Sequence, residues 1–448
     1  MAVAALLLFT FALHPIAAGN ATDIPGTERQ IRGWVEEPNS RGTLGIVRSS
    51  LTTVFLCTWT VLCLNVPAED ESCSSRLWRK FRWMMLALSG PEFLLCFAIG
   101  QYAASSRSVA LFHSSGFTEW SMQHGFFADM GGFVLAPPDF PNFPINSKQL
   151  HYLVSRGYVA MPSVSKREID DRTKANYFAK FVTIIQTTWF LLQVIGRGIT
   201  HLHVTTLELT AVAIVVCTFG TFYCWYKKPV DIEVPIVIHP NVDLSQILVE
   251  AGDVASAPYK QTPLEFIDDL TPAWSINVMA RFGLRSGPRR RPLRRLGNCR
   301  IPELDKAGRT LLFILTHIYG SMHMIGWNFV FPTSIERLLW RLAAATIFAT
   351  TFLFWALDRG EAWYFDREYM KWYYLITRKQ RPVDEKIGRD PDREFHAPMW
   401  VLLSHLLIAF CYTTARLYIF YEGFFGLREL PHSAFKSVDW TQAMPHFG

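Results

Sequence analysis

The stretch RWMMLALSGPEFLLCFAIGQYAA, residues 82–104, has the length and apolar character of a membrane helix but is broken in its middle. About 20 apolar residues cross a hydrocarbon core of roughly 30 Å. Proline is favoured at the first position of a helix and disrupts its interior. Ser89, Gly90 and Pro91 therefore predict two half-helices. Broken backbone at membrane depth must be lined by protein or water, so we expect a buried cavity near Pro91.

The composition places the whole chain in a membrane. Of its 448 residues, 50% are hydrophobic and 18% are charged, whereas soluble domains are about a quarter charged. Seven apolar runs are long enough to cross a bilayer, and a shorter run lies near 122–136. The runs are 44–66, 82–104, 178–197, 205–226, 309–331, 335–357 and 399–425. The predicted fold class is an all-α polytopic membrane helix bundle with about seven or eight membrane segments, one of them broken or re-entrant.

The N-terminus resembles a secretion signal. A short apolar core is followed by Pro15 and small residues, so residues 1–19 are predicted to be a signal peptide. A short retained anchor is the alternative. Asn20 begins the chain's only N-glycosylation sequon. Residues 20–43 are then a lumenal N-terminal segment that carries a glycan.

Lysine and arginine residues in the loops predict the orientation, because cytoplasmic loops are enriched in them. The basic loops 227–308 and 358–398 and the loop before residue 82 should all be cytoplasmic. This requires region 82–137 to cross an even number of times. Either it re-enters and returns, or segment 122–136 crosses back. Both schemes place the C-terminal tail, 426–448, in the lumen.

Between these loops we expect three membrane regions. The first covers 44–226, the second is a helical hairpin over 309–357, and the last is the helix 399–425. Capping boxes are expected to open three of the helices. They pair Ser165 with Glu168, Thr205 with Glu208 and Thr333 with Glu336.

Three ionisable residues inside the apolar runs are candidate catalytic residues. Glu92 follows Pro91, His323 lies in the fifth run and Arg416 lies near the middle of the last. Such groups are expensive at membrane depth and often mark functional sites. Arg416 needs a partner, and Glu92 is the first candidate. A purely structural pair, and capping of the new helix by Glu92, remain open.

Further polar residues are expected to line the cavity. Gln186, Gln193 and Arg197 form one stripe of the third run, while Trp327 and Asn328 lie on the inward side of the fifth. For the stripe, hydrogen bonding between helices and an Arg197 that reaches an interface are the alternatives.

The chain has no recognisable metal or cofactor motif. His317 and His323 are six residues apart, so one helix cannot easily direct both at one metal, and none of the eight cysteines forms a CxxC pair. Nucleotide-binding and serine-hydrolase motifs are absent too. We therefore expect no metal and no cofactor.

The basic stretch of the largest loop is expected to bind anionic lipid head groups rather than nucleic acid, because the net charge is only +6. Its arginines are Arg289, Arg290, Arg291, Arg294 and Arg295. A simple basic linker is the alternative.

Five stretches are similar to a group of uncharacterised multi-pass membrane proteins of fungi. They are WVEEPNSRGTLGIVRSSLTTVFLCTWTVLCLNVP (34–67), HGFFADMGGF (124–133), TPLEFIDDLTPAW (262–274), GWNFVFPTSIERLLWR (326–341) and LYIFYEGFFGLRELP (417–431). The resemblance implies a fungal integral membrane protein, and it implies no activity.

Three functions are compatible with these patterns. The first is an intramembrane enzyme for a lipophilic small molecule or lipid, with Glu92, His323 and Arg416 as its site. The second is a transporter or channel, because broken helices build midplane sites. The third is a membrane sensor or scaffold. The endoplasmic reticulum and the plasma membrane are both compatible locations.

Overall fold

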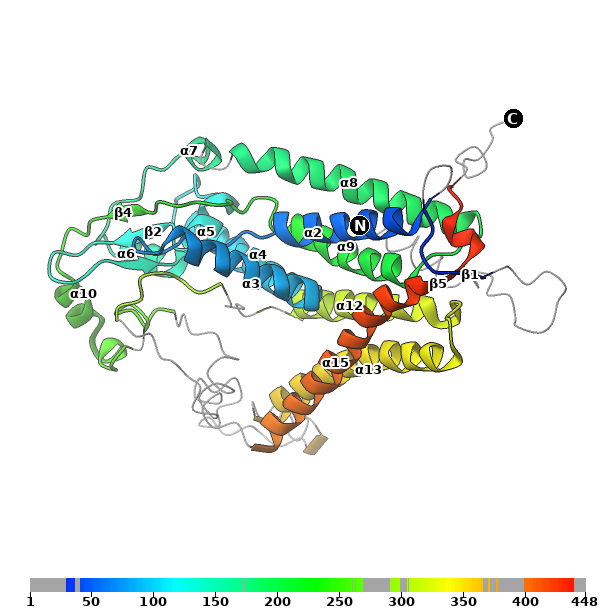
Figure 1. Ribbon diagram of the computed structural model, residues 1–448. Coiled ribbons are helices and arrows are strands. Elements are labelled where there is room, and N and C mark those ends of the chain that lie inside the picture. The colour runs from blue at the N-terminus through cyan, green and yellow to red at the C-terminus, as the bar shows by residue number, and fades with distance from the viewer. Residues whose placement is uncertain are drawn as a thin grey trace.

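The computed structural model is a helical bundle with a small mixed unit at one end (Figure 1). It describes residues 30–36, 41–171, 174–259, 261–268, 291–298, 304, 306–365, 370, 376–377 and 399–438. The predicted signal peptide, the Asn20 sequon, Arg289 and Arg290 lie outside the described residues. We call the end of the bundle next to the mixed unit the sheet end. The opposite end, where the last described residues of the chain lie, is the tail end.

Within the described residues, four helices are long and apolar enough to span a membrane. They are α8 (Lys174–Ile199), α9 (Thr206–Cys224), α13 (Ser334–Phe365) and α15 (Met399–Phe425). The broken pair described below would add a fifth only if its two helices together crossed the membrane once. The prediction of a helical membrane bundle therefore holds in outline, but that of seven or eight segments is not supported.

Two further helices accompany these spans but are short. α2 (Thr43–Thr60) has 18 residues and α12 (Lys306–Met322) has 17. At 1.5 Å per residue they are about 27 Å and 26 Å long, at the lower limit for crossing a hydrocarbon core, and neither is among the helices that are both long and apolar enough to span one. An apolar run in the sequence is thus not always a spanning helix.

The break predicted at residues 89–91 is present. α3 (Cys73–Ser89) and α4 (Pro91–Ser114) meet at Gly90 with a bend of 111°. Pro91 opens α4, where its missing N–H costs no hydrogen bond. Gly90 is required because a Cβ there would lie 2.5 Å from the Phe93 ring.

Both ends of this pair lie at the sheet end. Arg76, near the start of α3, forms an ion pair with Glu233, which lies just before strand β4 (Ile236–Ile238). Phe112, near the end of α4, is buried in the core of the mixed unit. The pair enters the bundle and returns to the same end, as one of the two predicted schemes requires.

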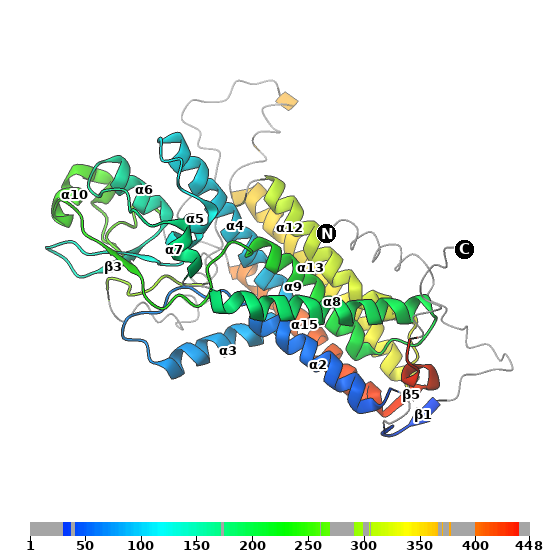
Figure 2. The ribbon, with the colours of Figure 1, turned by 90° about the horizontal axis from the view of Figure 1, so that it is seen from above.

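The mixed unit joins two segments far apart in sequence. Its sheet has the order β3-β2-β4, with β2 (Phe133–Leu135) antiparallel to β3 (Phe143–Ile145) and parallel to β4 (Ile236–Ile238). Helices α5 (Met122–Asp129), α6 (Ser147–Ser155), α7 (Lys166–Asp171) and α10 (Leu244–Ala251) surround it (Figure 2). The alternative in which 122–136 crosses back is therefore wrong. This segment forms α5 and β2, which pack in a core of their own.

The tail end brings both ends of the described chain together. β1 (Gln30–Arg32) pairs antiparallel with β5 (Glu429–Pro431). Arg41 forms an ion pair with Glu208, whose side chain also accepts the backbone N–H of Thr205 in the predicted capping box. The capping box predicted at Thr333 is half formed. The Thr333 side chain accepts the backbone N–H of Glu336, but the Glu336 carboxylate binds Arg428.

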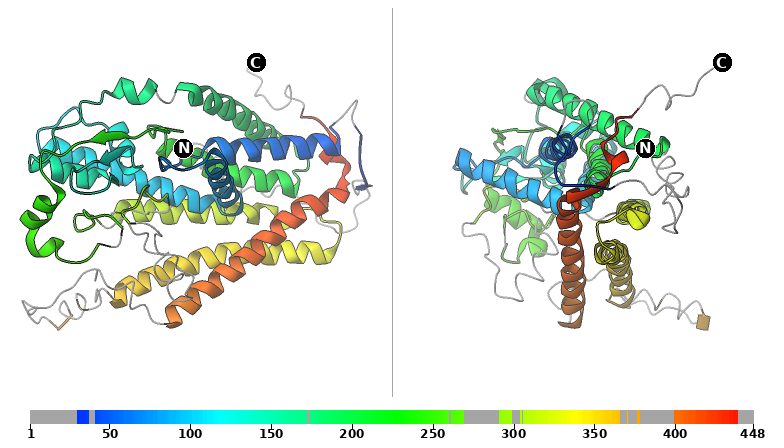
Figure 3. Two further views of the ribbon diagram at one scale, coloured as in Figure 1. Left: turned by 60° about the vertical axis from the view of Figure 1, so that its left-hand side comes forward. Right: turned by 45° about the vertical axis from the view of Figure 1, so that its right-hand side comes forward.

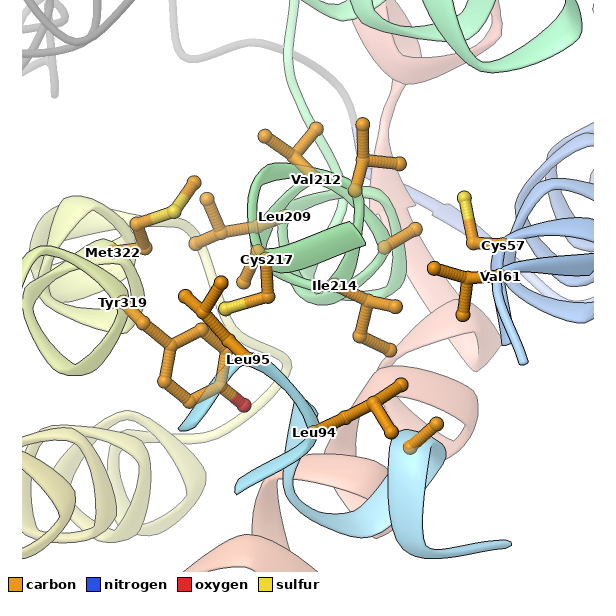
Figure 4. Close-up of a cluster of buried hydrophobic side chains, with 14 of the residues drawn as sticks. Cys57, Val61, Leu94, Leu95, Leu209, Val212, Ile214, Cys217, Tyr319 and Met322 are labelled. Atoms are coloured by element: carbon orange, nitrogen blue, oxygen red, sulfur yellow. The ribbon is translucent and has the colours of Figure 1, made fainter. Parts of the chain in front are cut away.

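Helix α9 is the centre of the bundle. Of its span, 78% is buried, against 22–28% for the other three spans. Its side chains Leu209, Val212, Ile214 and Cys217 are ringed by residues of α2, α4 and α12 (Figure 4). In contrast, α13 and α15 pack side by side at the edge of the bundle (Figure 3).

Candidate functional site

The break between α3 and α4 lies against a buried cluster of five ionisable side chains. Glu92 comes from the first turn of α4, Tyr319 from α12, and His323 from the start of the 3₁₀ helix η2 (His323–Asn328). Tyr412 and Arg416 come from α15. Glu92, Tyr319, His323 and Arg416 are at most 5% exposed. The three predicted catalytic residues therefore meet in one place.

Arg416 is held on several sides. Its Nε donates to the carbonyl of Ser89 at 3.2 Å, and its Nη1 lies 3.0 Å from His323 Nε2. The rings of Tyr319 and Phe420 lie 5.2 Å and 4.9 Å from the guanidinium carbon. Arg416 therefore binds the last turn of α3 at the break itself. This contact positions α15 against the broken pair α3 and α4.

Glu92 binds Tyr412, not Arg416. The Tyr412 hydroxyl donates to Glu92 Oε1, and no direct ion pair joins Glu92 to Arg416 in the described chain. Arg416 is nevertheless near enough for its charge to act on Glu92. Glu92 and Arg416 are thus neighbours within a wider cluster and do not form the direct pair that was predicted.

Among the described residues, one buried polar atom of each of three cluster residues has no hydrogen-bond partner. These atoms are Glu92 Oε2, His323 Nδ1 and Arg416 Nη2, whereas the Tyr319 hydroxyl lies beside that of Tyr412. A buried polar group left unpaired costs about 1–3 kcal/mol, and more when it is charged. Such a concentration in one place indicates a position for water or for the polar part of a ligand.

The contacts define what each free atom can do. Because an Arg416 N–H points at His323 Nε2, this nitrogen must accept, and His323 Nδ1 carries the proton in the neutral ring. The site thus offers N–H donors from His323 and Arg416, an acceptor from Glu92 and the Tyr319 hydroxyl. Among the described residues no group of three His, Cys, Asp or Glu could hold a metal ion.

The glutamines and arginine of α8 lie elsewhere. Gln186 and Gln193 are half-buried on this outer helix. Arg197 is buried at the tail end, where it donates to the carbonyls of His203, Ser433, Ala434 and Lys436 at 2.8–3.0 Å. None of them lines the cluster. The helical stripe was correctly identified, but α8 packs outside the ring around α9 and cannot present it to the interior.

Trp327 and Asn328 are also outside the cluster, in contrast to the prediction. Both are exposed and bind Arg341, which donates to the Trp327 carbonyl at 2.8 Å and to Asn328 Oδ1 at 3.1 Å. The prediction assumed a continuous α-helix. From His323 the chain is a 3₁₀ helix with about 3.0 residues per turn, which turns Trp327 away from the face of His323.

Sequence reasoning missed Tyr319 and Tyr412. A usable signal was present, because Tyr319 precedes His323, and Tyr412 precedes Arg416, by four residues. On a helix this spacing places two side chains next to each other. A tyrosine one turn before a buried ionisable residue is therefore worth including in such a site.

The basic stretch is partly engaged within the protein. Arg294 forms an ion pair with Asp70 at 2.5 Å, and Arg291 donates to the carbonyl of Tyr259 at 3.4 Å. Arg295 lies near Arg79. Binding of anionic lipids by this stretch stays a prediction.

Lys228 forms a separate buried polar contact at the sheet end. Its Nζ donates to the Cys63 carbonyl at 2.6 Å and to Gln101 Oε1 at 2.8 Å, and it lies over the Trp225 ring. Burial lowers the pKa of the Lys228 ammonium from its ordinary 10.5 to about 8. This lysine joins the ends of α2 and α9 to α4.

Comparison with known families supplies a membership but no activity. A model described as a family of unknown function, DUF8562, matches residues 7–257 and 295–447. The chain belongs to this family. No curated protein and no solved structure matches it.

Proposed function

We propose that this protein is an intramembrane enzyme that performs acid–base chemistry on the polar head of a lipophilic small molecule or lipid. The observation that carries the proposal is the presence of three unpaired buried polar atoms, on Glu92, His323 and Arg416, in the cluster beside the break between α3 and α4. A merely structural cluster would be expected to satisfy its own groups, because unpaired buried groups weaken the fold.

The donors suit a substrate oxygen. N–H groups of Arg416 and His323 would bind a carbonyl or hydroxyl oxygen and stabilise the negative charge that develops on it, in a region where water does not screen the attraction. The Glu92 carboxylate would accept the proton that leaves the substrate and later return it. Tyr412 holds the first oxygen of Glu92 and leaves the second for this transfer.

A comparison of membrane extracts tests the proposal. Host membranes carry the intact protein, Glu92→Gln, Glu422→Gln, or none. Glu422 is a suitable control because it is also a buried carboxyl of the bundle but binds Tyr418 outside the cluster. A lipophilic species should appear or be depleted with the intact protein and the control, but not with Glu92→Gln at equal protein level. Extracts that do not differ from the empty host would refute the enzyme.

The bend favours a second candidate, a transporter or channel. Discontinuous helices commonly build binding sites near the bilayer midplane, and the 111° bend at Gly90 lies beside the cluster. Unchanged extracts together with Glu92-dependent flux of a lipophilic solute in liposomes would favour this function. A membrane sensor or scaffold remains the third candidate, and no geometric feature singles it out.

We also propose that the sheet end faces the cytoplasm, in the endoplasmic reticulum or the plasma membrane. The basic residues of α3 and of the following loops support this orientation. In a chain in which the exposed Cys73 is replaced by serine together with Cys299, Val254→Cys, at the sheet end, should react with an impermeant maleimide in sealed microsomes. Arg32→Cys, at the tail end, should react only after permeabilisation. The opposite pattern would reverse the orientation.

A further inference from the structure

Two amide side chains on helix α8 carry no hydrogen bond to any described residue. Gln186 and Gln193 lie within the span Phe178–Ile199 and are half-buried. An amide that faces hydrocarbon without a partner is unfavourable, so helices that carry such residues tend to associate through them.

The glutamines belong to a longer pattern. Counting along α8 in alternating steps of three and four residues gives one continuous seam: Ala179, Val182, Gln186, Trp189, Gln193 and Gly196. This is the repeat of a left-handed helix pair, in which the seam of one helix meets that of another. Ala179 is exposed, Val182 is 40% exposed and Trp189 is 48% exposed.

The position of α8 leaves the apolar seam residues from Ala179 to Trp189 exposed, the two glutamines half-buried and Gly196 buried. Only 22% of its span is buried, and α8 runs along the outside of the bundle (Figures 1 and 2). Its buried side faces α2, where Thr60 Oγ1 donates to Thr183 Oγ1 at 3.0 Å. The seam lies next to this contact and is continuous with the outer surface.

We propose that α8 pairs with α8 of a second copy of this chain. A glutamine amide carries both a donor and an acceptor, so Gln186 can satisfy Gln186 of an identical helix, and Gln193 likewise. Two copies inserted in the same orientation are related by a two-fold axis along the bilayer normal. This arrangement sets each seam residue opposite its own counterpart. The inference does not depend on the proposed chemistry of the cluster.

Cysteine cross-linking in native membranes tests the pairing directly. Cys73 is exposed, and it is replaced by serine together with Cys299. Val182→Cys then places a thiol on the seam. Ile184→Cys is the matched control, because it is 42% exposed but points to the opposite side of the helix. Val182→Cys should form a disulfide-linked species of twice the chain mass, and Ile184→Cys should form at least tenfold less.

Single-molecule counting in supported bilayers tests the role of the amides. Replacing both glutamines by leucine should weaken dimerisation about tenfold, because hydrogen bonds between side chains stabilise pairs of membrane helices. Asparagine at both positions should restore most of it. The thermal melting of each variant in detergent shows whether the monomer still folds.

Three outcomes would overturn the proposal. The first is equal cross-linking at residues 182 and 184. The second is a cross-linked species whose mass identifies a different partner protein. The third is a leucine variant that dimerises as well as the intact chain.

Discussion

Removing the positive charge of the cluster should be costly, and the cost should depend on Glu92. In Arg416→Met the Ser89 carbonyl and His323 Nε2 lose their donor, and the Glu92 carboxylate loses the nearest cation. Breaking a buried charge network by removing one partner costs about 3–5 kcal/mol. We expect a loss of this size in the free energy of unfolding, measured by titration of mixed micelles with a denaturing detergent.

The geometry sets an upper limit on the interaction energy between Arg416 and Glu92. Two unit charges 4 Å apart attract by about 4 kcal/mol at an effective dielectric constant of 20, and no direct ion pair joins Glu92 and Arg416. The coupling should therefore be below this value, at about 1–3 kcal/mol. In a Glu92→Gln background Arg416→Met should cost less by that amount, because no buried carboxylate is left without its cation.

A double-mutant cycle decides the question. Leu417→Ala is the control for a change on the same helix, because Leu417 is 64% exposed and lies outside the cluster. If the losses of Glu92→Gln and Arg416→Met add within about 0.5 kcal/mol, the two residues are independent. The cluster would then not act as one site.

Three further changes have defined outcomes. Gly90→Ala drives a Cβ into Phe93 and should lower the free energy of unfolding by about 1–3 kcal/mol. Because the pKa of Lys228 is lowered to about 8 in the folded protein, the unfolded chain binds more protons between pH 8 and 10. Stability should therefore rise across this range, and this rise should be missing in Lys228→Met. Arg197→Lys should cost at least about 2 kcal/mol, because one ammonium cannot serve the carbonyls that the guanidinium binds; limited proteolysis should then cut the chain after residue 431.

Each of these three changes has a control or an outcome that would contradict it. Gly360→Ala lies in α13 with no atom within 4 Å of the added Cβ, so it should be neutral or stabilising by up to about 1 kcal/mol. For Lys228 the quantity compared is the pH-dependent difference between intact protein and variant, which removes the titration of other groups. If the intact protein and Lys228→Met showed the same dependence of stability on pH, the lowered pKa of the buried Lys228 would be contradicted. For Arg197, an unchanged cleavage pattern would show that the tail is held by other contacts.

The sequence predicted those residues of the candidate site whose charge is energetically costly to bury in a membrane. Glu92, His323 and Arg416 stand out because ionisable groups rarely lie in apolar runs, and the structure brings all three together. Tyr319 and Tyr412 did not stand out, since tyrosine is common in membrane segments. Trp327 and Asn328 were misplaced because a switch from α to 3₁₀ winding at His323 has no clear mark in the sequence.

The number of membrane segments was overestimated for a related reason. Hydropathy records how apolar a run is, but not where its helix starts and ends. The run 44–66 contains a helix that ends at Thr60, after which the chain binds the sheet end. The run near 122–136 is apolar because α5 and β2 are buried in a second core, and burial in protein leaves the same signature as burial in lipid.

By itself, the sequence determined the local features of this protein. Proline at residue 91 breaks a helix wherever it is placed, the capping box at Thr205 needs only four residues, and long apolar runs must be buried. These effects act within one or two turns of chain. Only the tertiary structure decided that β2 and β4, about 100 residues apart, form one sheet. It also decided that the broken pair returns to its starting end and that α8 is left outside with its glutamines. Those outcomes depend on which surfaces pack together, and packing joins residues that no short window of sequence contains.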